Sequence, residues 1–168
     1  MSTQLTRKIV SAASLCGIGV LAATVLAPRL TGAAEKAAKP WASKVVSWDE
    51  AKGPVEDWGE IRLHLLGETF STQDLLTGIA VLKPGQAIHG PHRHAEEEYM
   101  VLTEGAGTWH LDGKDIPAKV GDVLFAEPWV YHGLTNTSKA PLKFFVIKYN
   151  GKGVAPPPHP KDSRPDEL

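Results

Sequence analysis

Short apolar segments, each bounded by Gly or Pro, follow one another from residue 44 to residue 150 without a sustained helical period. Runs of this length and spacing, joined without helical crossovers, are typical of a β-sandwich or a β-barrel. The dipeptide Asp112-Gly113 predicts a two-residue hairpin turn. We expect one turn of helix at most, near residues 49–52, and strands at residues 45–48, 61–66, 77–82, 98–102, 107–111, 123–126, 133–136 and 142–149.

The first 33 residues have the three parts of a secretory signal peptide. Arg7 and Lys8 precede an uncharged apolar stretch, residues 9–27, which Pro28 ends. The small residues Thr31-Gly32-Ala33 then offer a site for signal peptidase. The alternative is an uncleaved anchor through residues 9–27, which could nearly span a bilayer. The many Ala and Gly residues of this stretch favour cleavage, so we expect export to the periplasm or the medium and no membrane association afterwards.

The composition of the rest of the chain excludes some kinds of cross-link, ligand and partner. The only cysteine, Cys16, lies in the signal segment, so the mature chain would have neither a disulfide nor a thiol ligand. The 18 basic residues are balanced by 19 acidic ones, which argues against a nucleic-acid partner. We expect a flexible leader at residues 34–43, one β domain at residues 44–150, and an extended, poorly ordered Pro-rich tail at residues 151–168.

A cluster of histidines and acids carries the chemistry. His92 and His94, two residues apart on a strand, would point to one face, and Glu98 could fold back toward them. Neutral imidazole and carboxylate are ligands of divalent transition metals. Two nearby histidines alone are a weak signal, because surface histidines are common. Glu96 and Glu97 are more typical of solvated acids, although a slip in register would make Glu97 the ligand instead of Glu98.

A second stretch, Gly121 to Asn136, strengthens this interpretation because the two together resemble the paired motifs of the cupin superfamily. The first motif is matched, with its spacing intact, by His92, His94, Glu98 and Gly105, and its leading glycine falls one residue early, at Gly85. The second is matched by Gly121, Pro128, His132 and Asn136, with Gly121 one residue farther from the Pro turn than usual. Trp129 stands where the family has a small Gly, and Asn136 suits a turn residue that bonds the backbone.

The resemblance implies an all-β, cupin-type double-stranded β-helix, which is a jelly-roll barrel of two antiparallel sheets. It also implies that one divalent transition metal per chain is bound by His92, His94, Glu98 and His132. Three imidazoles and one carboxylate leave two positions of an octahedral ion open, which favours manganese or ferrous iron, while zinc, nickel and copper stay possible.

Residues near the rim of such a barrel could take part in a reaction. Tyr131 and Glu127 precede the ligand His132 in its loop. Tyr131 could supply a phenol as acid or base, or only pack, and Glu127 could be a general base or a plain surface acid. His89 and His110 receive no assigned role.

The resemblance implies a fold and a metal site but no reaction. An intact ligand set favours a metal-dependent enzyme acting on a small organic substrate, either an oxygenase or a sugar-acid lyase or isomerase. The alternative is a non-catalytic module that binds metal or a small ligand. Strand 142–149 is apolar on both faces, with Phe144 and Val146 opposite Phe145 and Ile147, so we expect the outer face to be covered in a homodimer.

Overall fold

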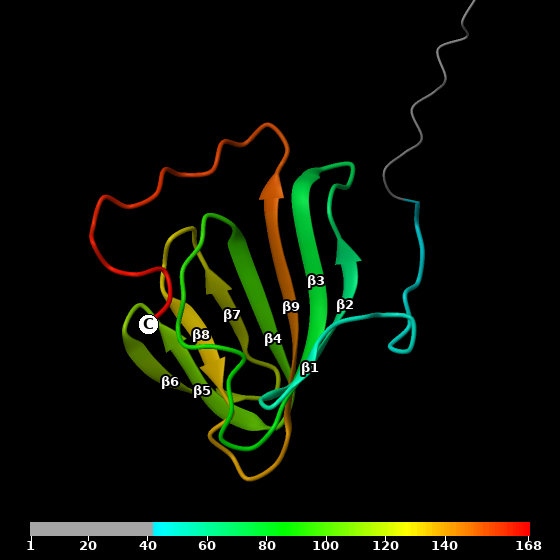
Figure 1. Cartoon of the computed structure of the whole chain (residues 1–168), viewed down its shortest axis with the longest axis vertical. Helices are drawn as coiled ribbons and strands as arrows, with labels where there is room; N and C mark the ends of the chain where they lie inside the picture. The colour runs from blue at the N-terminus through cyan, green and yellow to red at the C-terminus, as the bar shows by residue number, and fades with distance from the viewer. Residues whose placement is uncertain (1–41) are drawn as a thin grey trace, which may run out of the picture. The chain divides into compact units, whose positions relative to one another are not determined.

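The computed structural model describes residues 42–168, which form two antiparallel sheets without any helix (Figure 1). The expected signal peptide, the alternative anchor and most of the leader lie outside these residues. In the described part of the chain, no helix is long and apolar enough to cross a membrane. The predicted all-β jelly-roll class is confirmed.

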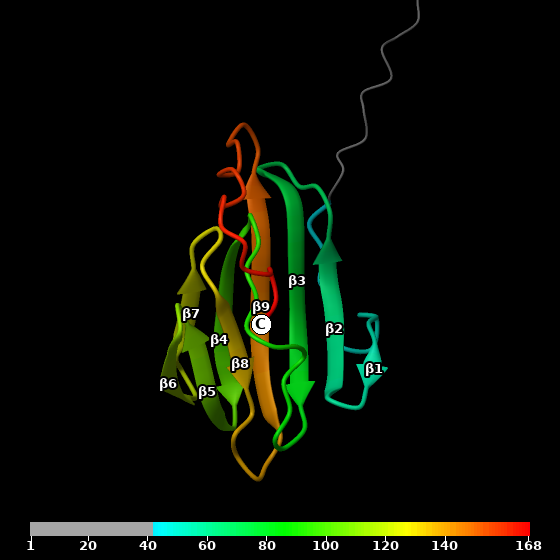
Figure 2. The same ribbon diagram turned by 60° about the vertical axis from the view of Figure 1, so that its left-hand side comes forward.

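The strands divide unequally between the two sheets (Figure 2). The six-stranded sheet has the order β1-β2-β3-β9-β4-β7, and the three-stranded sheet has the order β6-β5-β8. The bounds of the strands are β1 Val55–Glu56, β2 Gly59–Leu66, β3 Thr72–Leu82, β4 Glu97–Glu104, β5 Ala106–Leu111, β6 Lys114–Lys119, β7 Val123–Ala126, β8 His132–Thr135 and β9 Leu142–Gly151.

Alternation along the strands builds the core. Glu98, Met100 and Leu102 are the buried positions of β4, as the period of two predicts, and Phe144 and Val146 are buried on β9. The four apolar side chains among them belong to one hydrophobic core with residues of both sheets. Because Glu98 continues the inward-facing row of β4, its carboxylate stands at the polar end of an apolar barrel interior.

Strand prediction was wrong at three places. The expected strand at residues 45–48 is irregular chain that ends in a turn, and the short strand β1 was not expected. The hairpin at Asp112-Gly113 is confirmed, with φ of 48° and 74°. The strand that follows it, β6, was not expected, because its sequence KDIPAK carries no apolar pattern. Since β6 is the edge strand of the small sheet, its charges stay in water and its proline interrupts no central ladder.

The C-terminal tail differs from the expected poorly ordered segment. The chain leaves β9 and returns to the segment that precedes β4, where the two run side by side in both views (Figures 1 and 2). Acidic residues near the end of the tail form ion pairs with Arg93. Pro-rich composition describes only local preference, whereas the tail is held by partners about 70 residues away in the sequence.

Candidate metal centre

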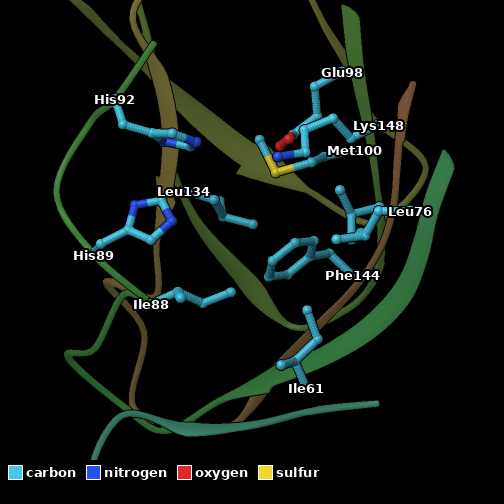
Figure 3. Close-up of a pocket in the computed structure, with 12 residues that line it drawn as sticks. Ile61, Leu76, Ile88, His89, His92, Glu98, Met100, Leu134, Phe144 and Lys148 are labelled. Carbon is cyan, nitrogen blue, oxygen red and sulfur yellow. The ribbon is translucent and has the colours of Figure 1, made fainter. Parts of the chain in front are cut away.

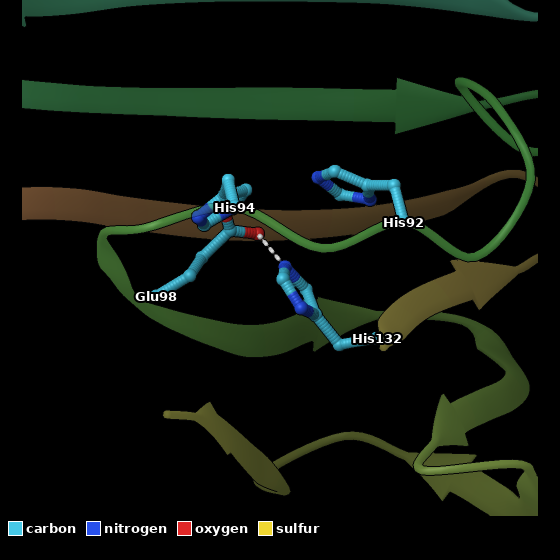
Figure 4. Close-up of side chains that lie close together, drawn as sticks. All are labelled: His92, His94, Glu98 and His132. Atoms are coloured by element: carbon cyan, nitrogen blue, oxygen red, sulfur yellow. Dashed lines mark hydrogen bonds and ion pairs between the residues drawn. The ribbon is translucent and has the colours of Figure 1, made fainter. Parts of the chain in front are cut away.

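Four side chains from distant parts of the sequence meet at one end of the barrel interior (Figure 4). His92 and His94 lie on the segment that leads into β4, Glu98 is the second residue of β4, and His132 is the first residue of β8. One ligand atom from each of the four lies within 4.8 Å of the others. The set is the one that the sequence predicts, and it contains Glu98 rather than Glu97.

Backbone hydrogen bonds fix which nitrogen two of the histidines present. The Nδ1 of His132 lies 2.8 Å from the carbonyl of Val130, and the Nδ1 of His94 lies 3.1 Å from the carbonyl of Glu96. A carbonyl only accepts, so each Nδ1 carries the proton. In the neutral form of each ring, the lone pair is then on Nε2, the nitrogen that faces Glu98 in the cluster. Partners outside the site orient metal-binding histidines in the same way.

The protein by itself leaves two polar atoms of the cluster without a hydrogen-bond partner. The Nδ1 of His92 and the Nε2 of His132 are buried and have no hydrogen-bond partner among the described residues. The His132 Nε2 lies 3.6 Å from a Glu98 oxygen, which is too long for a hydrogen bond. Buried polar atoms rarely stay unpaired. A divalent cation would satisfy both nitrogens and the carboxylate, so the donor set fits a metal ion.

Protonation equilibria point the same way. Burial and the neighbouring His132 and His89 lower the pKa of His92 to about 3. Burial by itself raises the pKa of Glu98, but the interactions with His132 and His94 outweigh it and lower that pKa to about 2. At neutral pH, His92 is therefore a neutral imidazole and Glu98 a carboxylate, which are the forms that bind metal.

A cavity of about 170 Å³ adjoins the cluster (Figure 3). His92 and Glu98 line its polar end together with His89 and Lys148. The remaining wall is mostly apolar and is formed by Ile61, Leu76, Ile88, Met100, Leu134, Phe144 and Val146. The volume is below the range of sites for drug-sized molecules, so the cavity suits a compact organic molecule.

Lys148 is the unexpected residue of this cavity. It lies on β9 directly opposite Glu98 of β4, and because paired residues share a face, its side chain points into the barrel (Figure 3). Among the described residues, no carboxylate lies within 4.0 Å of its ammonium and no hydrogen bond satisfies it. The inward orientation of Lys148 could have been predicted from the sequence, since Lys148 continues the alternate, inward-facing positions of Phe144 and Val146.

The other candidates from the sequence lie outside the cavity. Tyr131 is buried, and its hydroxyl donates to the carbonyl of Pro165 in the tail, so the structure places it in packing. Glu127 is exposed on a groove beside the tail. A catalytic role for either stays a prediction that this arrangement does not favour. Glu97 accepts a hydrogen bond from the hydroxyl of Tyr149 at 3.2 Å, away from the cluster.

The remaining polar residues singled out by the sequence divide between the cavity and the scaffold. His89 lines the cavity and its ring contacts His92 edge-on, with centroids 4.1 Å apart. His110 is held outside the cavity by Asp115, at 2.6 Å, and by Thr135. Asn136 is buried, and its amide donates to backbone carbonyls, including that of Leu82 at 3.1 Å, which confirms a structural role.

Comparison with known proteins identifies the family of this chain. A family model described as a cupin domain matches residues 78–148. An oxalate-binding protein from Thermotoga maritima is 35% identical over 92 residues, which are 53% of this chain and 75% of that protein. A gentisate 1,2-dioxygenase from a Streptomyces species is 30% identical over 96 residues, but the match covers only 26% of its length.

Solved structures give the same fold. A predicted oxalate decarboxylase from Thermotoga maritima superposes with a TM-score of 0.53 at 28% identity, covering 63% of this chain and 98% of that one. A protein with a double-stranded β-helix domain from Klebsiella pneumoniae, 23% identical, superposes with a TM-score of 0.53 over 67% of this chain and 95% of that one. With its two sheets, its four-residue cluster and these relatives, the chain belongs to the cupin superfamily.

Proposed function

We propose that this cupin is a metal-dependent enzyme acting on a small organic anion. The observation that carries the proposal is that His92 and Glu98, from the cluster of four side chains that could hold a metal ion, line the same small cavity as the unpaired ammonium of Lys148. The relatives named for oxalate and gentisate, both small organic acids, support this class of ligand.

Charge balance explains why the ligand should be an anion. Three neutral imidazoles and the Glu98 carboxylate leave a bound dication with one net positive charge, and Lys148 adds a second. Buried charge of one sign is costly without a counter-charge. A carboxylate ligand supplies that counter-charge, whereas a neutral molecule of the same size does not.

The chain's own residues divide the work of binding. Lys148 would pair with a carboxylate of the ligand, and the apolar wall around Phe144 and Leu134 would hold its carbon skeleton and exclude water. A bound divalent metal would supply Lewis acidity, and ferrous iron or manganese would also supply redox chemistry toward dioxygen. His89, at the edge of the cavity, is placed to hydrogen-bond the ligand.

Elemental analysis of the purified protein followed by oxygen-uptake assays tests the proposal. We expect about one manganese or iron per chain, and turnover of a small aromatic or aliphatic acid, with gentisate and oxalate as the first probes. The metal-free protein treated with chelator is the control. A wild-type protein with stoichiometric metal and no turnover of any small carboxylate, with or without dioxygen consumption, would contradict the enzymatic proposal.

A non-catalytic binding module is the second candidate, and the similarity to a protein named as oxalate-binding favours it. Isothermal titration with oxalate separates the two. Saturable, metal-dependent binding of unchanged oxalate, without turnover of other acids, would support a binding module.

Export and pairing complete the proposal. Residues 7–33 motivate cleavage near Ala33, so mass spectrometry of the protein from its native host should find a mature N-terminus close to that residue.

The outer face of the large sheet carries the stacked rings of Tyr99 and Phe125, 4.8 Å apart, and Phe125 is 40% exposed. We propose a homodimer through this face, which light scattering across a concentration series would test.

A further inference from the structure

The last seven residues of the chain pair with the segment that carries two metal ligands. The backbone nitrogen of Arg93 donates to the carbonyl of Asp166 at 2.8 Å, and that of Leu168 donates to the carbonyl of Pro91 at 2.9 Å. The approach is close enough that a Cβ at Gly90 would lie 2.0 Å from the carbonyl oxygen of Leu168. Residues 162–168, here called the C-terminal clamp, therefore add an antiparallel pairing along residues 91–93.

The ligand segment is held from both sides. His92 exchanges two backbone hydrogen bonds of 2.9 Å with His132 on one side and bridges to Glu167 of the clamp on the other. The segment is thus the middle element of a short three-part ladder. Without the clamp, one edge of this element would be unpaired, and its position would depend on the bonds to His132 alone.

Arg93 ties the clamp to the segment through its side chain. Arg93 lies between His92 and His94 in the sequence, but its guanidinium points away from the cavity. The Arg93 side chain is fully buried. It donates to both oxygens of Asp162 at 2.9 and 3.0 Å, to Asp166 at 3.0 Å and to the carbonyl of Arg164 at 2.7 Å. These bonds raise the pKa of Arg93 and lower that of Asp162.

A buried guanidinium without counter-charges is strongly unfavourable. In the described part of the chain, Asp162 and Asp166 are the carboxylates that pair with Arg93, and both belong to the clamp. Loss of the clamp would therefore take both counter-charges and two backbone hydrogen bonds away from residues 91–93, the segment that contains His92 and adjoins His94.

The second ligand loop is anchored to the tail as well. The Tyr131 hydroxyl donates to Pro165, and the Tyr131 ring lies 5.0 Å from the guanidinium carbon of Arg93 and 5.2 Å from that of Arg164. The indole nitrogen of Trp129 donates to the carbonyl of Pro157 at 2.9 Å. The tail thus contacts the loop before His132 as closely as it contacts the segment of His92 and His94.

We propose that the C-terminal clamp positions the metal ligands, with Arg93 as the positioning residue, and that metal retention depends on it. The inference rests on the metal site of the proposed function and extends it to a segment that touches no ligand atom. By linkage, metal binding stabilises the docked clamp by the same free energy that the clamp contributes to metal binding.

Metal affinity is the first test. Asp162→Asn removes a counter-charge of Arg93 with little change of shape, and Asp57→Asn is the charge-matched control, because Asp57 is exposed in the turn between β1 and β2. Competition with a chromophoric chelator would measure Mn²⁺ and Co²⁺ affinity of each variant and of a chain that ends at Pro160. We expect at least a tenfold loss for Asp162→Asn and for the truncated chain, as for outer partners of metal ligands, and no loss for Asp57→Asn.

Two further measurements separate positioning from general stability. The absorption spectrum of bound Co²⁺ should change in Asp162→Asn, and a synthetic peptide of residues 154–168 should restore Co²⁺ affinity to the truncated chain. In the wild-type protein, Mn²⁺ should slow hydrogen exchange of the amides in residues 166–168 and leave those near Gly113 unchanged. This readout needs no variant and holds even if the truncated chain does not fold.

The outcomes are distinguishable from failure of the proposed function. Wild-type metal affinity in Asp162→Asn and in the truncated chain, or clamp amides indifferent to Mn²⁺, would overturn the clamp alone. A wild-type protein that binds neither Mn²⁺ nor Co²⁺ would overturn the metal site and the clamp together.

Discussion

The backbone nitrogen of Trp129 donates a 2.7 Å hydrogen bond to the carbonyl of His94, and Trp129 does so with a φ of 65°. This bond joins the two loops that carry the candidate metal ligands. A left-handed backbone is the conformation that glycine adopts without strain, which fits the glycine expected at this position from the motif resemblance. In this protein Trp129 adopts the strained conformation, and its indole contacts Pro157 and His159 of the tail.

Replacement of Trp129 should separate backbone strain from indole contacts. Trp129→Gly and Trp129→Ala both lose the indole, but only Ala keeps a Cβ in the left-handed region. We expect the Gly variant to be more stable than the Ala variant by about 1 kcal/mol in free energy of unfolding. Urea denaturation of both variants checks this, and equal stability would show that the loop relaxes out of the strained conformation.

His132→Ala should remove the metal and the stability that depends on it. His132 comes from β8 of the three-stranded sheet, and its buried Nε2 has no hydrogen-bond partner among the described residues. A ligand present at 100 times its dissociation constant stabilises a protein by about 2.7 kcal/mol. We expect added Mn²⁺ to raise the unfolding temperature of the wild type and not that of His132→Ala. His64→Ala, on β2 and outside the cluster, is the control that should still respond.

Substitution of the neighbouring acids should decide which one binds. Glu98→Gln removes the carboxylate that lies 3.2 Å from the Nε2 of His94, whereas Glu97→Gln affects only the contact with Tyr149. We expect Glu98→Gln to weaken Mn²⁺ binding by tenfold or more, and Glu97→Gln to leave it near the wild-type value. Chelator competition measures both, and the reverse order would place the strand in the shifted register.

Lys148→Met should weaken anion binding without affecting the metal. Met keeps the length of the side chain and removes its charge, so we expect about a tenfold loss of oxalate affinity, or about 1.4 kcal/mol, with unchanged metal content. Lys143→Met is the control on the same strand, because Lys143 lies near the ring of Trp48 outside the barrel. Equal oxalate binding by Lys148→Met and the wild type would mean that the ligand does not reach the ammonium.

The metal-free protein should lose stability as the pH falls below 6.5. The pKa of His92 is about 3 in the folded state, against its ordinary value of 6.5, so between these pH values the unfolded chain binds the extra proton. Glu98, with a folded pKa of about 2 against 4.5, adds a second loss between pH 4.5 and 2. Urea denaturation of chelator-treated protein from pH 7 to 4 measures the decline. His92→Asn should flatten it above pH 4.5, and an unchanged slope in that variant would assign the decline to other groups.

Much of the site follows from local spacing. His92, His94 and Glu98 lie within seven residues, so strand alternation and one turn bring them together wherever the segment docks. The hairpin at Asp112-Gly113 is likewise a local matter of positive φ. The sequence did not predict β6, because an edge strand can form without an apolar face. The pairing of β6 with β5 is set by the hairpin turn that joins them rather than by the residues of β6.

From the sequence by itself, periodicity predicted an all-β fold and short-range spacing placed His92, His94 and Glu98 together, because both are properties of the local chain. The jelly-roll barrel and the place of His132 in the cluster came from the resemblance to the cupin motifs. Only the tertiary structure decided that Lys148 shares a cavity with the cluster, since the pairing of β9 with β4 joins residues 50 positions apart. It also decided that Tyr131 packs and that the Pro-rich tail is ordered. Burial of Arg93 requires counter-charges, and the fold supplies them from the far end of the chain.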